Sequence, residues 1–254
     1  MDTCSLDSLQ AVQSFSDHPL FYFCCVFATV VGAIAGATAS SRVRMDIVGV
    51  LVCGTIASLG GGTVRDILLS GMLTQTGNPI TVYWVVGHDV QFLYMAIITS
   101  LVMFYLTRFW NPPVGTIRVA DAFAMAFFTL LGAAKAYYLG CSGLVCICMG
   151  VCTGVAGGAL RDVLTGNVPY VFRSKEVYAS AAFSGSLLFV VLQYFNCPYQ
   201  ISYILGTIVV FTVRMVAVYM NWRLPSYRSL LDAVSHDEQP TEEASGKSSL
   251  RAKD

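Results

Sequence analysis

The sequence contains few charged residues. Only 12% of its 254 residues are Asp, Glu, Lys or Arg, about half the fraction found in soluble domains. The formal net charge is zero, so no nucleic-acid partner is expected, because such a partner requires a basic surface. This composition disfavours a water-soluble fold and directs attention to the membrane.

Histidine is also scarce, and its distribution excludes several enzyme classes. The three histidines are scattered at positions 18, 88 and 236, without a Ser-His-Asp arrangement or a phosphate-binding loop. The nine cysteines lie mostly in apolar stretches, where they serve as small hydrophobes. Among Cys146, Cys148 and Cys152 only the last two share a helix face, and no histidine lies near them. We therefore expect no catalytic residue, no cofactor and no resident metal.

Apolar residues are what the sequence has in excess. They make up 56% of the chain, and the mean hydropathy is +0.65. Apolar runs of helix-spanning length recur from residue 20 to residue 221, which predicts an all-α polytopic membrane protein. No basic residue precedes the first run, so we expect no signal peptide. Seven transmembrane helices are expected, at about residues 20–40, 45–70, 82–107, 119–139, 144–165, 175–195 and 199–222.

One glycine-rich motif with an Arg-Asp pair occurs twice inside these runs. Its members are Gly60, Gly61, Gly62, Arg65 and Asp66 in the first copy and Gly157, Gly158, Arg161 and Asp162 in the second. Each glycine weakens a helix by about 1 kcal/mol relative to alanine, so we expect helices 2 and 5 to be broken at the glycines. Lipid cannot satisfy the backbone groups that a break exposes, so these groups would face protein, water or ions.

The basic residues predict the orientation of the helices. Alternate loops contain arginine or lysine, and the remaining loops contain neither. Because basic loops stay in the cytoplasm, we expect the N-terminus outside and the C-terminus in the cytoplasm. The membrane is the plasma membrane or, in a eukaryote, an intracellular one.

This orientation makes the two halves of the chain an inverted repeat. Helices 1–3 start outside and helices 4–6 start inside, which gives a 3+3 inverted repeat followed by a seventh helix. The expected parts are an extracytoplasmic segment 1–19, repeat 1 at 20–110, repeat 2 at 117–196, helix 7 at 199–225 and a disordered cytoplasmic tail 232–254.

Isolated charges interrupt the other helices. Asp121 and Lys135 lie fourteen residues apart on one helix, which places them within about 40° on one face but about 21 Å apart along the axis. They are too distant to pair, so both are expected to face the protein interior or a wet path, unless Lys135 extends to the interface. Asp46 and Arg214 are expected as further supporting buried charges. Arg214 would neutralise an acid such as Asp46 or Asp121.

Charged residues also open the third helix of each repeat. His88 and Asp89 in the first repeat correspond to Lys175 and Glu176 in the second. They are either interfacial charges at a helix start or the vestibule or gate of a pathway. Lys175 and Glu176 are therefore counted among the candidate pathway residues.

These motifs together resemble the trimeric intracellular cation channel family, in its prokaryotic-type branch, whose repeat is also described as a bacterial glycine-transporter domain. The resemblance covers about residues 20–225. It depends on seven motifs: Arg44-Met-Asp46, Gly60-Gly-Gly-Thr-Val-Arg-Asp66, Asp121-Ala-Phe, Gly132-Ala-Ala-Lys135-Ala, Gly157-Gly-Ala-Leu-Arg-Asp162, Lys175-Glu-Val177 and Asn221-Trp-Arg-Leu-Pro225. The chain departs from the family in its tail after Pro225 and in Ala156, which stands where the first repeat has Gly60.

The resemblance implies a homotrimer of seven-helix subunits, each with its own hydrophilic pore lined by helices 2 and 5. Such a pore passively conducts monovalent cations, K+ and Na+. The family's pore-lining glycines correspond here to Gly60, Gly61, Gly62, Gly157 and Gly158. Membrane lipids are the other expected partner, including bound lipid.

Two alternatives stay open from the residues alone. A secondary transporter of a small zwitterion such as glycine also uses inverted repeats with broken helices. In that case a helix N-terminus would hold the carboxylate, and Asp66 or Asp162 would hold the amine. Likewise, each Arg-Asp pair either braces its helix or contacts the ion directly.

Overall fold

The part of the chain that the structure describes folds into a bundle of seven α-helices. A computed structural model describes residues 19–75, 82–85, 89–109, 112–172, 177–220 and 222, and all regular structure within them is helical. The helices are α2 (Pro19–Arg42), α3 (Ile47–Gln75), α4 (Val90–Phe109), α5 (Val114–Tyr138), α6 (Gly143–Leu164), α7 (Ala179–Tyr194) and α8 (Tyr199–Met220), with a short 3-10 helix η2 (Tyr170–Phe172) before α7. Six of them are long and apolar enough to cross a membrane, and α7 is a shorter apolar helix. The expected seven-helix fold is confirmed.

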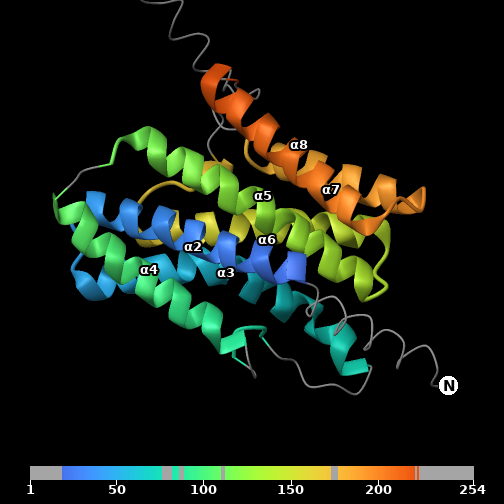
Figure 1. The fold of residues 1–254 in the computed structure, drawn as a ribbon, viewed down its shortest axis with the longest axis horizontal. Helices are drawn as coiled ribbons and strands as arrows, with labels where there is room; N and C mark the ends of the chain where they lie inside the picture. The colour runs from blue at the N-terminus through green and yellow to red at the C-terminus, as the bar shows by residue number, and fades with distance from the viewer. Residues whose placement is uncertain are drawn as a thin grey trace, which may run out of the picture. The chain divides into compact units, whose positions relative to one another are not determined.

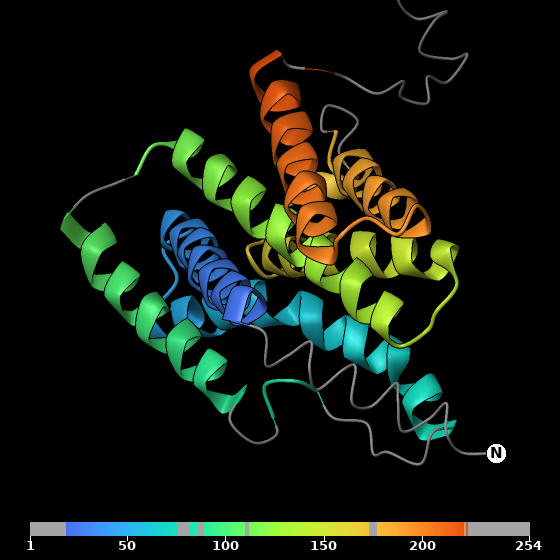
Figure 2. The same cartoon turned by 45° about the vertical axis from the view of Figure 1, so that its right-hand side comes forward.

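Two packed groups of helices follow the order of the chain. In the first, α2 packs on α3 and α4, and in the second α5 packs on α6 and α7. The two groups meet where α3 packs on α6 and α2 on α5, and α8 completes the bundle against α5 and α7. Figure 1 and Figure 2 show α4 on one side of this centre and α7 and α8 on the other. Helix α5 is the most buried of the six candidate spans, as its contacts with both groups require.

Three helices begin later than expected. Helix α4 starts at Val90 rather than near residue 82, because residues 83–85 form a turn. Helix α7 starts at Ala179 rather than near residue 175. Helix α3 starts at Ile47, and the side chain of Asp46 accepts a hydrogen bond from the Gly49 amide at 2.8 Å. Asp46 is exposed and is therefore a helix cap, which corrects its expected place among the buried charges.

The glycines do not break their helices, which corrects the expectation from helix propensity. Helix α3 is uninterrupted through Gly60–Gly62, and α6 through Gly157 and Gly158. A Cβ on Gly61 would lie 2.1 Å from the carbonyl oxygen of Thr153, and one on Gly157 would lie 2.5 Å from that of Ala57. The two helices thus cross with their backbones in contact, which only glycine allows. Close packing offsets the low helix propensity, and an unbroken helix satisfies its own backbone in lipid.

Candidate functional site: two buried ion-pair clusters

The first cluster consists of Arg65, Asp66, Tyr83 and Lys135. The Asp66 carboxylate, 1% exposed, accepts hydrogen bonds at Oδ1 from Arg65 Nε and Lys135 Nζ, each at 2.8 Å. Its other oxygen accepts a hydrogen bond from the Tyr83 amide at 3.0 Å. The Arg65 guanidinium lies 5.6 Å from the centre of the Tyr83 ring, at a distance typical of a cation–π contact. Two cations thus share one carboxylate, which also holds the turn after α3 in place.

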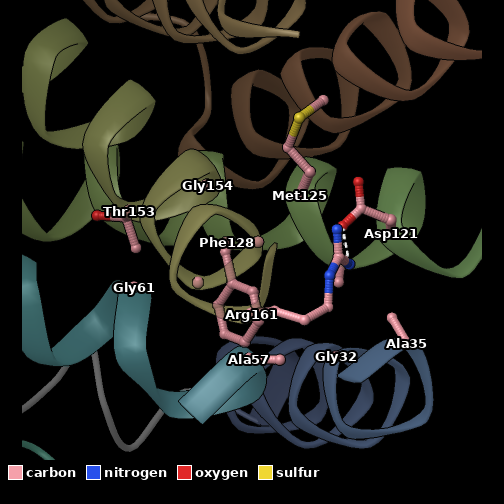
Figure 3. Close-up of a pocket in the computed structure, with 13 residues that line it drawn as sticks. Gly32, Ala35, Ala57, Gly61, Asp121, Met125, Phe128, Thr153, Gly154 and Arg161 are labelled. Carbon is pink, nitrogen blue, oxygen red and sulfur yellow. Dashed lines mark hydrogen bonds and ion pairs between the residues drawn. The ribbon is translucent and has the colours of Figure 1, made fainter. Parts of the chain in front are cut away.

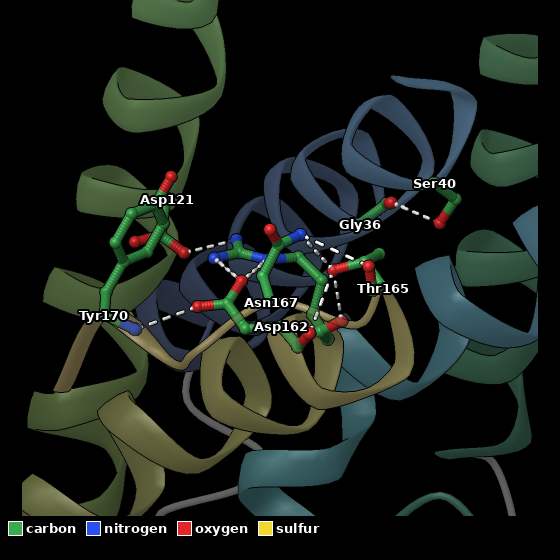
Figure 4. Close-up of polar contacts among 8 residues, drawn as sticks. Gly36, Ser40, Asp121, Asp162, Thr165, Asn167 and Tyr170 are labelled. Atoms are coloured by element: carbon green, nitrogen blue, oxygen red, sulfur yellow. Dashed lines mark hydrogen bonds and ion pairs between the residues drawn. The ribbon is translucent and has the colours of Figure 1, made fainter. Parts of the chain in front are cut away.

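The second cluster consists of Asp121, Arg161, Asp162 and Tyr170. Arg161, 1% exposed, donates from Nε to Asp162 at 2.9 Å and from a terminal nitrogen to Asp121 at 2.5 Å. The second oxygen of Asp162 accepts a hydrogen bond from the Tyr170 amide at 3.0 Å. The Arg161 guanidinium lies 5.6 Å from the centre of the Tyr170 ring. Figure 4 shows Asp121 and Asp162 converging from α5 and α6, with Tyr170 beside them.

The chain reversal after α6 brings Tyr170 back to the second cluster. Gly166 has a φ of 70°, which suits glycine at a helix C-terminus. The Asn167 amide then donates to the carbonyl of Asp162 at 2.8 Å, and the Asn167 side chain donates to the Thr165 hydroxyl at 3.0 Å. The loop is therefore folded tightly onto the last turn of the helix that carries Arg161 and Asp162.

The two clusters repeat one arrangement but differ in charge. In each, an arginine and the following aspartate pair with each other, and the aspartate holds the backbone of a tyrosine. The difference comes from α5, which supplies Lys135 to the first cluster and Asp121 to the second. In the first repeat, the positions equivalent to Lys135 and Asp121 are found by counting back the same number of residues that separates Gly157 from Gly61. They are Ala39 and Cys25 of α2, and neither is charged. The first cluster has an excess cation and the second an excess carboxylate.

The ion pairs decide the open questions about single charges. Lys135 and Asp121 do not pair with each other, as expected from their separation. Lys135 extends to Asp66 rather than to the membrane interface. Asp121 pairs with Arg161. The guanidinium of Arg214 lies 4.8 Å from the ring centre of Tyr178. The sequence could not identify these partners, because they come from separate helices.

A small cavity lies beside the second cluster, between α2, α3, α5 and α6. Figure 3 shows Arg161 and Asp121 at one end of it and Gly61 and Thr153 at the other. It has room for about one water molecule. Gly61 of the first motif copy and Gly157 and Gly158 of the second line this cavity because they lack side chains, and they do not line it through unwound backbone carbonyls.

The remaining motif glycines make room for side chains. A Cβ on Gly62 would lie 2.5 Å from the Tyr83 ring, and one on Gly158 would lie 2.6 Å from the Tyr178 hydroxyl. A Cβ on Gly60 would meet a Leu160 methyl group at 2.9 Å. The glycine motif therefore has two roles: it brings α3 and α6 together, and it makes room for the Tyr83 ring beside Arg65 and for the Tyr178 hydroxyl.

The tyrosines are the site residues that the sequence analysis missed. Tyr83 and Tyr170 occupy equivalent places, each after the proline that follows its motif copy. The spacing differs, since Tyr83 lies four residues after Pro79 and Tyr170 directly follows Pro169, so spacing alone gave no signal for them. His88, Lys175 and Glu176 lie outside the described residues, and Asp89 directly precedes α4.

Comparison with known sequences places the chain in a family of membrane proteins. A family model described as "Glycine transporter" matches residues 22–108 and 118–194. The inner membrane protein YadS of Escherichia coli (strain K12) is 34% identical over 212 residues, which cover 82% of this chain and 96% of that protein. The membrane protein YvgT of Bacillus subtilis is 30% identical over 208 residues, with coverages of 82% and 96%.

Solved structures with the same fold are cation channels. A trimeric intracellular cation (TRIC) channel orthologue from Rhodobacter sphaeroides superposes with a TM-score of 0.71 at 27% identity, covering 80% of this chain and 100% of that chain. A second TRIC channel, solved to explain conductance, gives 0.70 at 27% identity, with coverages of 82% and 98%. The chain therefore belongs to the glycine-transporter (UPF0126) family of multi-pass membrane proteins, and through its fold to the prokaryotic-type branch of the trimeric intracellular cation channels.

Proposed function

We propose that this protein is a passive channel for monovalent cations, K+ and Na+, with one pathway in each subunit. The observation that carries the proposal is the pair of buried ion-pair clusters around the α3–α6 crossing, with a water-sized cavity beside one of them. Buried charges in a membrane protein are costly and commonly mark a route for ions. The related solved structures are cation channels, which supports the same assignment.

The unbroken helices change the mechanism that this proposal implies. Since α3 and α6 expose no unwound carbonyls, a permeating cation would be solvated by water and by carboxylates such as Asp66 and Asp162. In the described conformation both carboxylates are occupied by cationic side chains of the protein. Conduction then requires the arginine and lysine partners to separate from the carboxylates, so the clusters act as closed gates.

The proposal extends to assembly and placement. The related channels are trimeric, and we propose a homotrimer surrounded by, and in part bound to, membrane lipid. The loop charges support an N-terminus outside and a C-terminus in the cytoplasm. Chemical cross-linking in membranes tests the trimer, and a cysteine-reactive reagent that does not cross membranes tests the orientation through cysteines introduced in the terminal segments.

A recording from purified protein in a planar lipid bilayer tests the channel. Under a KCl gradient we expect unitary currents that reverse near the equilibrium potential of K+. The family description makes glycine transport the competing function. Saturable glycine uptake into liposomes that depends on an ion gradient, in the absence of unitary currents, would contradict the channel and support the transporter.

Replacing Lys135 with methionine tests the first cluster as a gate. The change removes one of the two cations on Asp66 and leaves Arg65 as its partner. We expect K+ current through the bilayer to rise severalfold, because cations then meet less positive charge beside the carboxylate. Lys135→Arg keeps the charge and serves as the matched control, with current near that of the wild type. Equal currents from the methionine and arginine variants would argue against an electrostatic role for Lys135.

A further inference from the structure

Helix α8 contains a buried arginine that reaches the second cluster through aromatic rings. Arg214 is 1% exposed, and its guanidinium lies 4.8 Å from the ring centre of Tyr178. Tyr178 is 3% exposed and directly precedes α7. Because α8 follows both repeats, Arg214 has no equivalent in the first half of the chain.

Tyr178 connects Arg214 to the ion pairs in two ways. Its ring stacks on Tyr170 with a centroid distance of 6.3 Å and an interplanar angle of 28°, and the Arg161 guanidinium contacts the Tyr170 ring. Its hydroxyl approaches Gly158 from the same side as Asp121: a Cβ on that glycine would lie 2.6 Å from the hydroxyl and 3.3 Å from the carboxylate. Two arginines therefore enclose two stacked tyrosines, next to the Asp121–Arg161 pair.

The first cluster provides a natural comparison. Its tyrosine, Tyr83, is in ring contact with Phe92 at 5.8 Å, and Phe92 in turn with Tyr22 at 6.0 Å. This row of rings begins at Arg65 and continues into apolar α4 and α2. The aromatic row at the second cluster instead ends at a cation on α8.

We propose that Arg214 is a positioning residue for the second cluster: through Tyr178 and Tyr170 it holds Arg161 against Asp121, so that α8 controls the opening of that end of the pathway. The control of opening rests on the proposed channel function. The effect on the position of the loop does not, because the tyrosine stack exists whatever the protein transports.

Hydrogen–deuterium exchange of the two equivalent loops measures the positioning directly. The Tyr170 amide bonds to Asp162 and the Tyr83 amide bonds to Asp66, so each loop reports on its own cluster. In Arg214→Met we expect exchange in a peptide spanning residues 166–172 to accelerate by about 2- to 30-fold, the range that corresponds to loss of a cation–π contact. Exchange around Tyr83 should stay at the wild-type rate. If both loops accelerate equally, or neither does, the proposal is overturned.

Three further variants separate positioning from simple loss of stability. Arg214→Lys keeps the buried charge without the planar guanidinium and should show a smaller acceleration of the same loop, so the test holds if the methionine variant does not fold. Tyr178→Phe keeps the stacked rings and removes only the hydroxyl beside Asp121, so the same loop should accelerate less than in Arg214→Met. Tyr203→Phe removes a hydroxyl from a buried tyrosine elsewhere on α8 and should leave both loops unchanged. Acceleration of residues 166–172 in this control would contradict a specific role for Arg214.

Bilayer recordings test the link to opening. Arg214→Met and Arg214→Lys should raise the open probability while the unitary conductance stays at the wild-type value, because Arg214 does not line the cavity. An unchanged open probability alongside accelerated loop exchange would limit Arg214 to holding the loop and would overturn its control of the pathway. Absence of any K+ current in the wild type would overturn the channel function and leave the exchange result standing.

Discussion

Replacing Arg161 with methionine is expected to destabilise the protein by about 3–5 kcal/mol, because it leaves Asp121 and Asp162 as two buried carboxylates without their cation. The measurement is the midpoint of thermal unfolding in detergent, followed by size-exclusion chromatography of heated samples. The matched control is Arg65→Met in the first cluster. There Lys135 still pairs with Asp66, so we expect a loss about half as large or smaller.

Neutralising Asp121 and Asp162 distinguishes the cost of unpaired charge from the cost of lost packing in this experiment. In a variant that combines Arg161→Met with Asp121→Asn and Asp162→Asn, no unpaired carboxylate remains, and we expect most of the lost stability to return. Equal losses for Arg161→Met and Arg65→Met, with no recovery in the triple variant, would show that the unpaired acids are not the cause.

Replacing Gly61 with alanine is expected to have the largest effect of any single added methyl group on α3. Its Cβ would lie 2.1 Å from the Thr153 carbonyl oxygen, so α3 and α6 would have to move apart along a crossing that the motif glycines share. We expect a loss of about 1–3 kcal/mol or more, and the larger Gly61→Leu should prevent accumulation of the folded protein. Unfolding midpoints and the yield of monodisperse protein measure both effects.

Gly115 supplies the control for Gly61. It lies in the first turn of α5, and a Cβ there would meet nothing within 4 Å. Gly115→Ala should therefore be neutral or stabilise the protein by up to about 1 kcal/mol through helix propensity. If Gly61→Ala behaved like Gly115→Ala, the backbone contact between α3 and α6 would not set their separation.

The two glycines also show how far the sequence could predict this fold. The periodic apolar runs predicted seven helices, and the paired motifs predicted that Arg65 and Arg161 have equivalent places. The role of Gly61 was mispredicted because propensity counts only its cost within one helix, whereas the benefit lies in a second helix about a hundred residues away in sequence. The formation of a helix depends on residues that are close in sequence, whereas the crossing of two helices depends on residues that are far apart in sequence.

The partners of the buried charges were unpredictable for the same reason. The pairing of Lys135 with Asp66 joins helices from different repeats, and sequence spacing carries no information about that crossing. Asp46 was misplaced because an acid at a helix start serves equally well as an exposed cap or as a buried charge, and only its surroundings distinguish the two. The tyrosines were missed because Tyr83 lies in a turn and Tyr170 in a three-residue 3-10 helix, and neither segment is long enough to show a hydrophobic period.

The charges on α5 make the two otherwise similar clusters electrostatically different. Repeat architecture alone would give both ends of the proposed pathway the same chemistry. The electrostatic potential along the pathway would then be the same in either direction. One helix removes that equivalence by placing an ammonium at one end and a carboxylate at the other. Current driven one way and current driven the other way therefore meet these charges in opposite order, and rectification is the expected electrical signature.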